Sequence, residues 1–142
     1  MTIHEQQNPL DAPADKVWGV LADFGNFLPW ATGGNGSIEL EGEGVGMIRH
    51  MDLPGLGKLS ERLDKLDPAQ RVLGYSLLGE AAGMAEYRCE VTVADSESGC
   101  VLHWRAEFTP AAGLDAADMV ASLGGSYDGM SAALAQFVAA SS

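Results

Sequence analysis

The longest regular pattern of hydrophobic positions lies near the end of the chain, between Asp115 and Ala140. Apolar residues recur there every three or four positions, as one face of an α-helix requires, at Met119, Val120, Leu123, Tyr127, Met130, Leu134, Phe137 and Val138. Pro110 and Gly113 end the strand before it. Asp115 and Asp118 favour a helix start, because negative charge stabilises a helix N-terminus. We therefore predict a long terminal helix that buries one broad face.

The residues before this helix form short segments typical of strands, separated by turn residues. We predict a first strand over residues 3–10, then a helix that starts near Pro13 and a short helical turn at 27–30. Further strands are predicted over 38–41, 44–53, 58–66, 72–78, 84–94 and 100–109. Strands at this spacing indicate one curved antiparallel sheet wrapped around the terminal helix. The expected fold class is α+β, with residues 1–142 as a single domain.

The charge balance excludes several classes of partner. Lys plus Arg total 8 against 20 Asp plus Glu, a formal net charge of −12. Phosphate backbones and anionic membranes repel such a chain, so we expect no nucleic acid and no stable membrane association. The first residues lack the basic start and apolar run of a signal peptide, and no stretch reaches about 18 apolar residues. We therefore expect a cytoplasmic protein.

The two cysteines are expected to be free thiols. On neighbouring strands joined by the turn at 96–99, Cys100 would face about Asp95 and Cys89 about Ala106. That separation is too long for a disulfide. Two free thiols fit a reducing compartment. His4, His50 and His103 lack metal-ligand spacing with these cysteines, so no metal and no cofactor is expected.

Period-two alternation predicts which strand residues face the helix. Met47, Arg49, Met51 and Leu53 share one face of their strand, as Leu59, Glu61 and Leu63 do on the next. Arg49 and Glu61 would lie opposite each other, within reach of a cross-strand pair. A charged pair among Met and Leu side chains is stable only when its members are paired.

The last strand is ambiguous by pattern alone. His103, Arg105 and Glu107 share one face, and the apolar Leu102, Trp104, Ala106 and Phe108 share the other. The apolar set is the one that a sheet normally buries. The pattern therefore leaves open whether Arg105 and Glu107 line an interior space.

Several fragments in order resemble a known family, namely residues 11–18 (DAPADKVW), 45–49 (VGMIR), 61–67 (ERLDKLD), 75–76 (YS) and 104–110 (WRAEFTP). They are similar to the polyketide cyclase/dehydrase branch of the START-like, or SRPBCC, superfamily. The resemblance covers about residues 3–138. It implies a helix-grip fold, in which a seven-stranded sheet grips the C-terminal helix, two short helices separate the first two strands, and a ligand cavity lies between sheet and helix.

The resemblance also implies site residues. In the abscisic-acid receptors of this superfamily, the positions matching Glu61, Tyr87, Cys89 and Glu107 face ligand, which favours the Glu107 face of the last strand as the inner one. Residues 53–55 resemble the gate loop of those receptors. Residues 30–37 contain no Lys to anchor a ligand carboxylate, and 79–84 lack the His-Arg latch, so a hormone-receptor role is not expected.

Alternation, helical spacing and the resemblance together give the predicted ligand-binding set. It comprises Trp30, Met47, Arg49, Met51, Leu53, Pro54, Leu59, Glu61, Tyr75, Leu77, Tyr87, Cys89, Arg105, Glu107, Met119, Leu123, Ser126, Tyr127 and Met130. An adaptable apolar lining would come from the methionines Met47, Met51, Met84, Met119 and Met130, although Met also fills cores without binding anything. Gly124, Gly125 and Gly129 in the helix either open room for a ligand or permit close packing.

Three functions fit these residues. The leading hypothesis is binding of a hydrophobic or aromatic small molecule in an internal cavity, with a lipid as one candidate. The second is a polyketide cyclase or dehydratase that uses Glu61, Glu107, Arg49 and Tyr87, because a desolvated glutamate has a raised pKa and an Arg or Tyr can stabilise an enolate. The same groups could instead form a satisfied polar network. The third is an interaction module, such as a homodimer, with a vestigial cavity.

Overall fold

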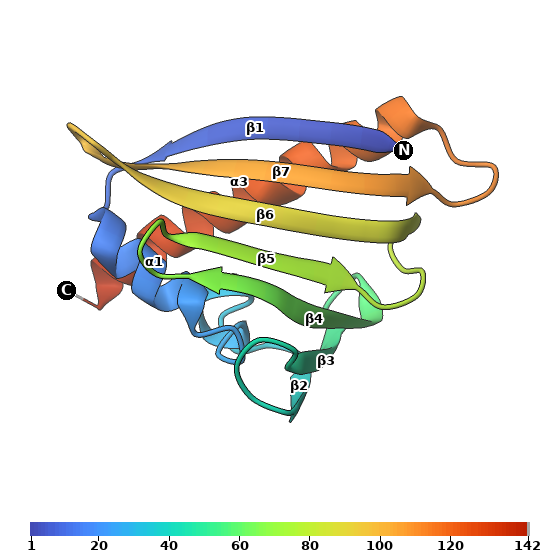
Figure 1. The fold of residues 1–142 in the computed structure, drawn as a ribbon, viewed down its shortest axis with the longest axis horizontal. Coiled ribbons are helices and arrows are strands. Elements are labelled where there is room, and N and C mark those ends of the chain that lie inside the picture. The colour runs from blue at the N-terminus through green and yellow to red at the C-terminus, as the bar shows by residue number, and fades with distance from the viewer. Residues whose placement is uncertain (142) are drawn as a thin grey trace.

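The computed structural model describes residues 1–141. Its elements in chain order are β1 (Thr2–Leu10), α1 (Ala14–Ala22), α2 (Leu28–Ala31), β2 (Ser37–Glu41), β3 (Ile48–Leu53), β4 (Gly57–Asp67), β5 (Val72–Leu77), β6 (Met84–Ser96), β7 (Gly99–Pro110) and α3 (Ala116–Ala140). Figure 1 shows them along the chain from blue to red. The α+β helix-grip fold that the sequence predicts is confirmed.

The seven strands form one antiparallel sheet in the order β1-β7-β6-β5-β4-β3-β2. Every pair of neighbouring strands except β1–β7 is also consecutive in sequence, so hairpins build most of the sheet. Strand β3 starts later than predicted, at Ile48, because Gly42, Gly44 and Gly46 all have positive φ values and form the loop after β2. Glycine adopts that conformation without steric strain, so these residues turn the chain rather than extend it.

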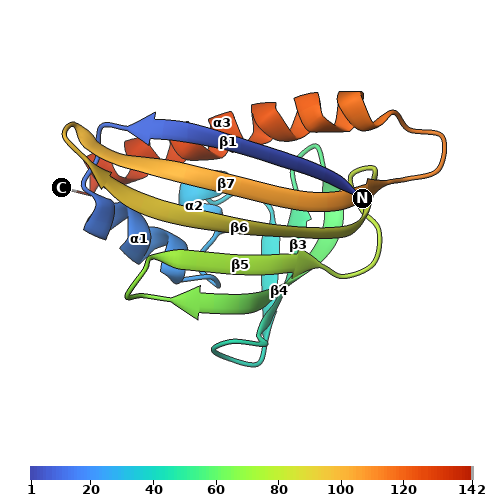
Figure 2. The same ribbon diagram turned by 45° about the horizontal axis from the view of Figure 1, so that its top comes forward.

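Helix α3 runs along one face of the sheet for its full length (Figures 1 and 2). Asp115 caps it, and its carboxylate accepts hydrogen bonds from the backbone N–H groups of Ala117 and Asp118. The buried positions of the helix are Leu123, Tyr127, Ser131, Leu134 and Val138. Met119, Val120, Met130 and Phe137 of the predicted stripe are only partly buried but still pack against the core.

One end of the molecule is solidly packed. Helix α1 contacts β6, β7 and α3, and it buries Val17 and Leu21 there. Trp104 of β7 donates its indole N–H to the Ser131 hydroxyl at 3.1 Å, which ties the middle of β7 to α3. Because α1 and α2 both pack against α3, they fix the helix over the sheet and leave room elsewhere beneath it.

The cysteine geometry agrees with the prediction from spacing. Cys100 pairs with Asp95 and Cys89 with Ala106 across the β6–β7 ladder, and both thiols are free and buried. None of the helices within residues 1–141 has the length and hydropathy needed to span a membrane.

Candidate functional site

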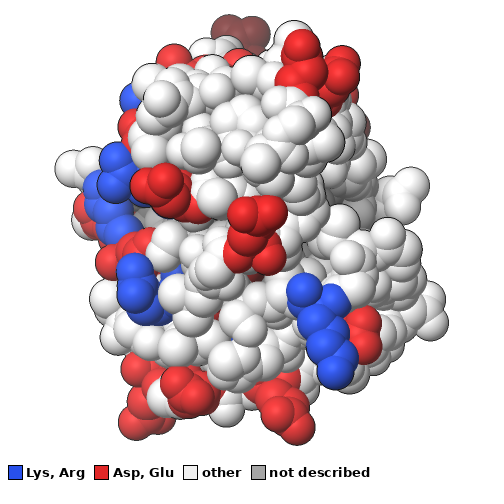
Figure 3. Space-filling view, turned by 90° about the vertical axis from the view of Figure 1, so that its right-hand side faces the viewer, with Lys and Arg blue, Asp and Glu red and all other residues white. Residues whose placement is uncertain are grey.

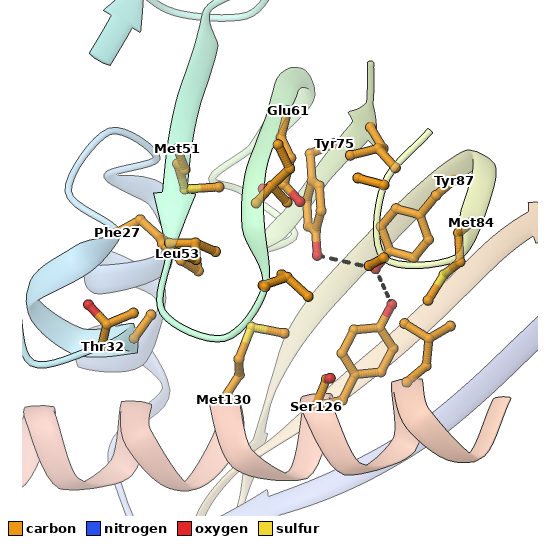
Figure 4. A pocket seen from close by; sticks show the side chains of 18 of the residues that line it. Phe27, Thr32, Met51, Leu53, Glu61, Tyr75, Met84, Tyr87, Ser126 and Met130 are labelled. Carbon is orange, nitrogen blue, oxygen red and sulfur yellow. Dashed lines mark hydrogen bonds between the residues drawn. The ribbon is translucent and has the colours of Figure 1, made fainter. Parts of the chain in front are cut away.

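An open cavity of about 560 Å³ lies between α3 and the inner face of β3–β6. Figure 4 shows side chains from the sheet, α2 and α3 converging on it. It is lined by Phe27, Ala31, Thr32, Arg49, Met51, Leu53, Pro54, Leu56, Leu59, Glu61, Tyr75, Leu77, Ala81, Ala82, Met84, Tyr87, Ser122, Leu123, Ser126, Tyr127, Gly129 and Met130. Most of these side chains are apolar, and the polar ones come from a few separate elements.

The loops that border this cavity lie at one end of the molecule. Leu56, Leu78 and Leu114 are exposed in the β3–β4, β5–β6 and β7–α3 loops. Figure 3 faces this end and shows mostly uncharged surface, with one acidic side chain near the centre, others toward the edges, and basic side chains at the left and lower right. The loops at this end therefore expose apolar side chains although the whole chain is strongly acidic.

Most of the predicted ligand-binding residues meet around the cavity. They are Arg49, Met51, Leu53, Pro54, Leu59, Glu61, Tyr75, Leu77, Tyr87, Leu123, Ser126, Tyr127 and Met130. Their strands are neighbours in the sheet, and the period of two brings alternate residues to one face. The residues on α3 follow because i, i+3 and i+4 positions share a helix face.

Arg49 and Glu61 form a buried ion pair in the cavity wall. They are direct partners in the β3–β4 ladder, and Arg49 Nε and Nη2 both donate to Glu61 Oε1, at 2.9 and 2.6 Å. Nη1 donates to the carbonyl oxygen of Phe24 at 3.0 Å. The rings of Phe24 and Phe27 lie 3.8 and 4.3 Å from the guanidinium carbon, which adds cation–π attraction. Each nitrogen of the guanidinium is thus engaged.

The second oxygen of Glu61 is left open. Oε2 has no hydrogen-bond partner among residues 1–141, whereas Oε1 takes both bonds from Arg49. Yet no fully buried side-chain oxygen or nitrogen in that part of the chain lacks a partner. Oε2 must therefore be accessible from the cavity, where it is a charged acceptor among apolar side chains.

Three tyrosine hydroxyls meet in the cavity wall beside this pair, and the Tyr75 ring lies 5.5 Å from the Arg49 guanidinium carbon. The Tyr75 and Tyr87 hydroxyl oxygens are 3.4 Å apart, and Tyr87 is hydrogen-bonded to Tyr127 (Figure 4). The Tyr127 ring is held between Trp104, at 4.5 Å between centroids, and His4, at 6.1 Å. Burial raises the pKa of all three phenols, so they stay protonated near neutral pH and can donate or accept hydrogen bonds.

The inner face of the last strand is not the one that the resemblance favoured. Leu102, Trp104, Ala106 and Phe108 are completely buried, at 0–1 % exposure, so they form the inner face of β7. Burial of this apolar set stabilises the fold, whereas burial of the charged set would require desolvation of several ions. The assignment of Arg105 and Glu107 to the cavity is therefore wrong.

On the outer face, Glu107 is bound by two arginines. Arg105 Nη1 donates to Oε1 at 2.6 Å and Arg88 Nε to Oε2 at 2.7 Å. These hydrogen bonds, first from Arg105 and then from Arg88, lower the pKa of the Glu107 carboxyl. Arg88, Arg105 and Glu107 border a separate polar depression of about 500 Å³ on that face. Glu107 thus has neither the location nor the raised pKa of the predicted cavity acid.

Four other predicted residues lie outside the cavity lining. Trp30 is buried against Phe27 with ring centroids 5.1 Å apart. Met47 lies before β3 and pairs its backbone carbonyl with Leu63. Cys89 faces inward but lies behind the tyrosines, and Met119 packs near Gly83 rather than over the cavity.

Sequence reasoning missed lining residues of two kinds. Those in α2 and in loops have no periodicity to reveal them, namely Phe27, Ala31, Thr32, Leu56, Ala81 and Ala82. Met84, expected among the lining methionines, does line the cavity, although the β6–β7 register shift between Ala85 and Arg88 breaks the period of two and puts it out of phase with Tyr87. Ser122 could have been found, since it lies four residues from Ser126 on one helix face.

The three glycines of α3 prove to differ. A Cβ added at Gly124 would meet Gln6 at 3.5 Å and His4 at 3.9 Å, so this glycine faces β1. A Cβ at Gly125 or Gly129 would meet no atom within 4 Å. Of the three, Gly129 alone lines the cavity. The expectation that a helix glycine opens room thus applies to Gly129, and close approach to a strand applies to Gly124.

A family model described as polyketide cyclase / dehydrase and lipid transport matches residues 1–140. The chain belongs to this family. The predicted START-like resemblance is therefore confirmed. A comparison with curated proteins gives no significant match. Within residues 1–141, no three His, Cys, Asp or Glu side chains are placed to hold a metal ion.

Several solved structures share the fold of this chain at low sequence identity. An uncharacterised protein of Bacillus thuringiensis is 20% identical, with a TM-score of 0.79, over 96% of this chain and 98% of that one. Norcoclaurine synthase from Thalictrum flavum, solved with dopamine and hydroxybenzaldehyde, is 22% identical, with a TM-score of 0.76, over 96% and 86%. A Nitrosospira multiformis protein is 20% identical, with a TM-score of 0.74, over 95% and 94%.

Proposed function

We propose that this protein binds a hydrophobic, aromatic small molecule in the cavity between α3 and the sheet. The observation that carries the proposal is the cavity itself, whose volume of about 560 Å³ falls within the roughly 300–1,000 Å³ of small-molecule sites. A mostly apolar wall with a few convergent polar groups is also typical of such sites. A vestigial cavity in an interaction module would be much smaller.

The wall favours a flat aromatic ligand. Tyr75 and Tyr87 present rings from adjacent strands, with centroids 6.1 Å apart. Met51, Met84 and Met130 approach from β3, β6 and α3. Flexible thioethers fit their shape to a ring and make favourable sulfur–aromatic contacts. Dopamine and hydroxybenzaldehyde, bound by the synthase of the same fold, are both aromatic and of similar small size.

The proposal is tested by measuring how tightly the uncharged fluorophore N-phenyl-1-naphthylamine binds to wild type and to two glycine variants that form a matched pair. Gly129→Leu would place its side chain in the cavity, and Gly125→Leu would add the same side chain one helical turn away, outside the lining. We expect wild type and Gly125→Leu to bind the fluorophore alike and Gly129→Leu to lose at least about tenfold in affinity, the equivalent of about 1.4 kcal/mol. Equal affinity of all three proteins, or no binding by any, would contradict the proposal.

A second candidate, a cyclisation or dehydration reaction, rests on the open oxygen of Glu61. Oε2 could accept a proton from a bound substrate, and the Tyr87 phenol could donate a hydrogen bond to an enolate oxygen. Glu107 has no part in this version. Glu61→Gln should abolish turnover of a polyketide-like substrate while the far-ultraviolet circular dichroism spectrum stays the same. Turnover by Glu61→Gln at the wild-type rate would remove this candidate.

A further inference from the structure

We infer that the cavity selects aromatic ligands that carry a hydrogen-bond donor, as a hydroxyl or an ammonium group, and rejects carboxylates. This inference rests on the proposed function and specifies its ligand class. It follows from which polar groups in the wall are already engaged and which remain open.

The one cation among the lining residues of the described chain cannot serve a ligand anion. Arg49 donates from Nε and Nη2 to Glu61 and from Nη1 to Phe24, and aromatic rings lie close to its guanidinium carbon. To bind a ligand carboxylate, the guanidinium would have to leave a buried carboxylate unpaired. An anionic ligand would therefore gain no free positive charge in this wall.

The one open charged group among the described lining residues is an acceptor. Glu61 Oε2 is unpaired and reaches the cavity, while Oε1 of the same carboxylate accepts both hydrogen bonds from the guanidinium. The Thr32 hydroxyl is directed at two carbonyl oxygens, those of Leu28 and Asn35, so its single proton is used and its lone pairs remain. The tyrosine hydroxyls, and Ser122 and Ser126 near the entrance, can still donate, but all of these donors are neutral.

Charge decides between ligand groups at Glu61. In a cavity of low dielectric, a donor that reaches Oε2 forms a charge-assisted hydrogen bond, which is roughly twice as strong as a neutral one. A ligand carboxylate at the same place would face a like charge and lose its hydration. We expect about tenfold or more in affinity between these two kinds of ligand.

The test is a matched series on the naphthalene ring, measured by displacement of N-phenyl-1-naphthylamine at pH 7. The series comprises 2-naphthol, 2-naphthylmethylammonium, 2-methylnaphthalene and 2-naphthoate. We expect the first two to bind about tenfold more tightly than 2-methylnaphthalene, and 2-naphthoate to bind most weakly. The naphthol and ammonium arms separate a neutral donor from a cationic one. If 2-naphthoate binds as tightly as 2-naphthol, the inference is overturned.

A pair of Glu→Gln variants assigns the selectivity to one carboxylate. Glu61→Gln keeps an oxygen for Arg49 but removes the charge, so the advantage of the two donor ligands over 2-naphthoate should fall about tenfold. Glu107→Gln, on the outer face, should leave the series unchanged. An unchanged series in Glu61→Gln would overturn the inference. Equal binding of all four ligands by wild type would also overturn it but would leave the proposed function standing, whereas no binding of the fluorophore or of any ligand would remove both.

Discussion

Two arginine–glutamate clusters lie on opposite faces of the same sheet, and they behave differently. Arg49 and Glu61 are 6 and 7 % exposed and lie against aromatic rings in the cavity wall. On the outer face, Glu107 pairs with Arg88 and Arg105, whose side chains are 66 and 45 % exposed. Water solvates the outer arginines, whereas the inner pair depends on its own hydrogen bonds. The surroundings, more than the residue types, decide which cluster can act on a ligand.

Removal of one partner from each cluster should give the largest contrast. Glu61→Ala leaves the Arg49 guanidinium buried without a counter-ion, and we expect a loss of about 3–5 kcal/mol in unfolding free energy. Glu107→Ala should leave the midpoint of urea denaturation close to wild type. The double variant Arg49→Met with Glu61→Leu should recover most of the loss, because apolar residues of similar volume remove both buried charges. Equal effects of the two single variants would break the comparison.

The inner face should also suppress thiol chemistry. Burial raises the pKa of the Cys89 thiol to about 11, despite hydrogen bonds from the nearby tyrosines that lower it. At pH 8 only about one molecule in a thousand would carry the reactive thiolate, by the usual relation of pH and pKa. We expect no alkylation of Cys89 by iodoacetamide within the time that labels the protein fully in guanidinium chloride. Rapid labelling of native Cys89, read by mass spectrometry of its peptide, would contradict this account of the inner face.

The outer cluster should produce a small, pH-dependent effect. The lowered pKa of Glu107 means that its contribution to stability is present above the unfolded-state pKa and disappears as pH falls through the folded-state pKa. Wild type should therefore be slightly more stable than Glu107→Gln at pH 7, and the difference should shrink as the pH falls to 3. Urea denaturation at both pH values, at low and high salt, measures this gap. A gap that widens on acidification would have the wrong sign.

The sequence predicted the fold well because its signals are periodic. The stripe on α3 follows because about one residue in each helical turn faces the core. The alternation on β3 and β4 follows because every second strand residue faces the core. The same alternation placed Arg49 opposite Glu61, as the ladder confirms. Loop residues of the cavity, such as Leu56 and Ala81, could not be found in this way, because they lie outside any repeat.

The error at β7 has an instructive cause. The hydrophobic pattern alone favours Leu102 and Trp104 as inner residues, whereas the analogy to a receptor glutamate favours Glu107. A shift of one residue would exchange the two faces of the whole strand, so alternation fixes the face strongly where one set is apolar. The β-bulge near Met84 shows where alternation fails, because the register shift puts Met84 out of phase with the rest of its strand.

The central claim is that an aromatic ligand lies among the methionines of the cavity, and their methyl groups can report it directly. In a protein labelled with ¹³C at the methionine methyls, titration with 2-naphthol should shift the signals of Met51, Met84 and Met130 through the ring current. Met1 and Met47, which do not line the cavity, serve as internal controls. The account predicts saturable shifts of the three cavity methyls with the controls unmoved. Unmoved cavity methyls at saturating ligand, or equal shifts at the controls, would contradict it.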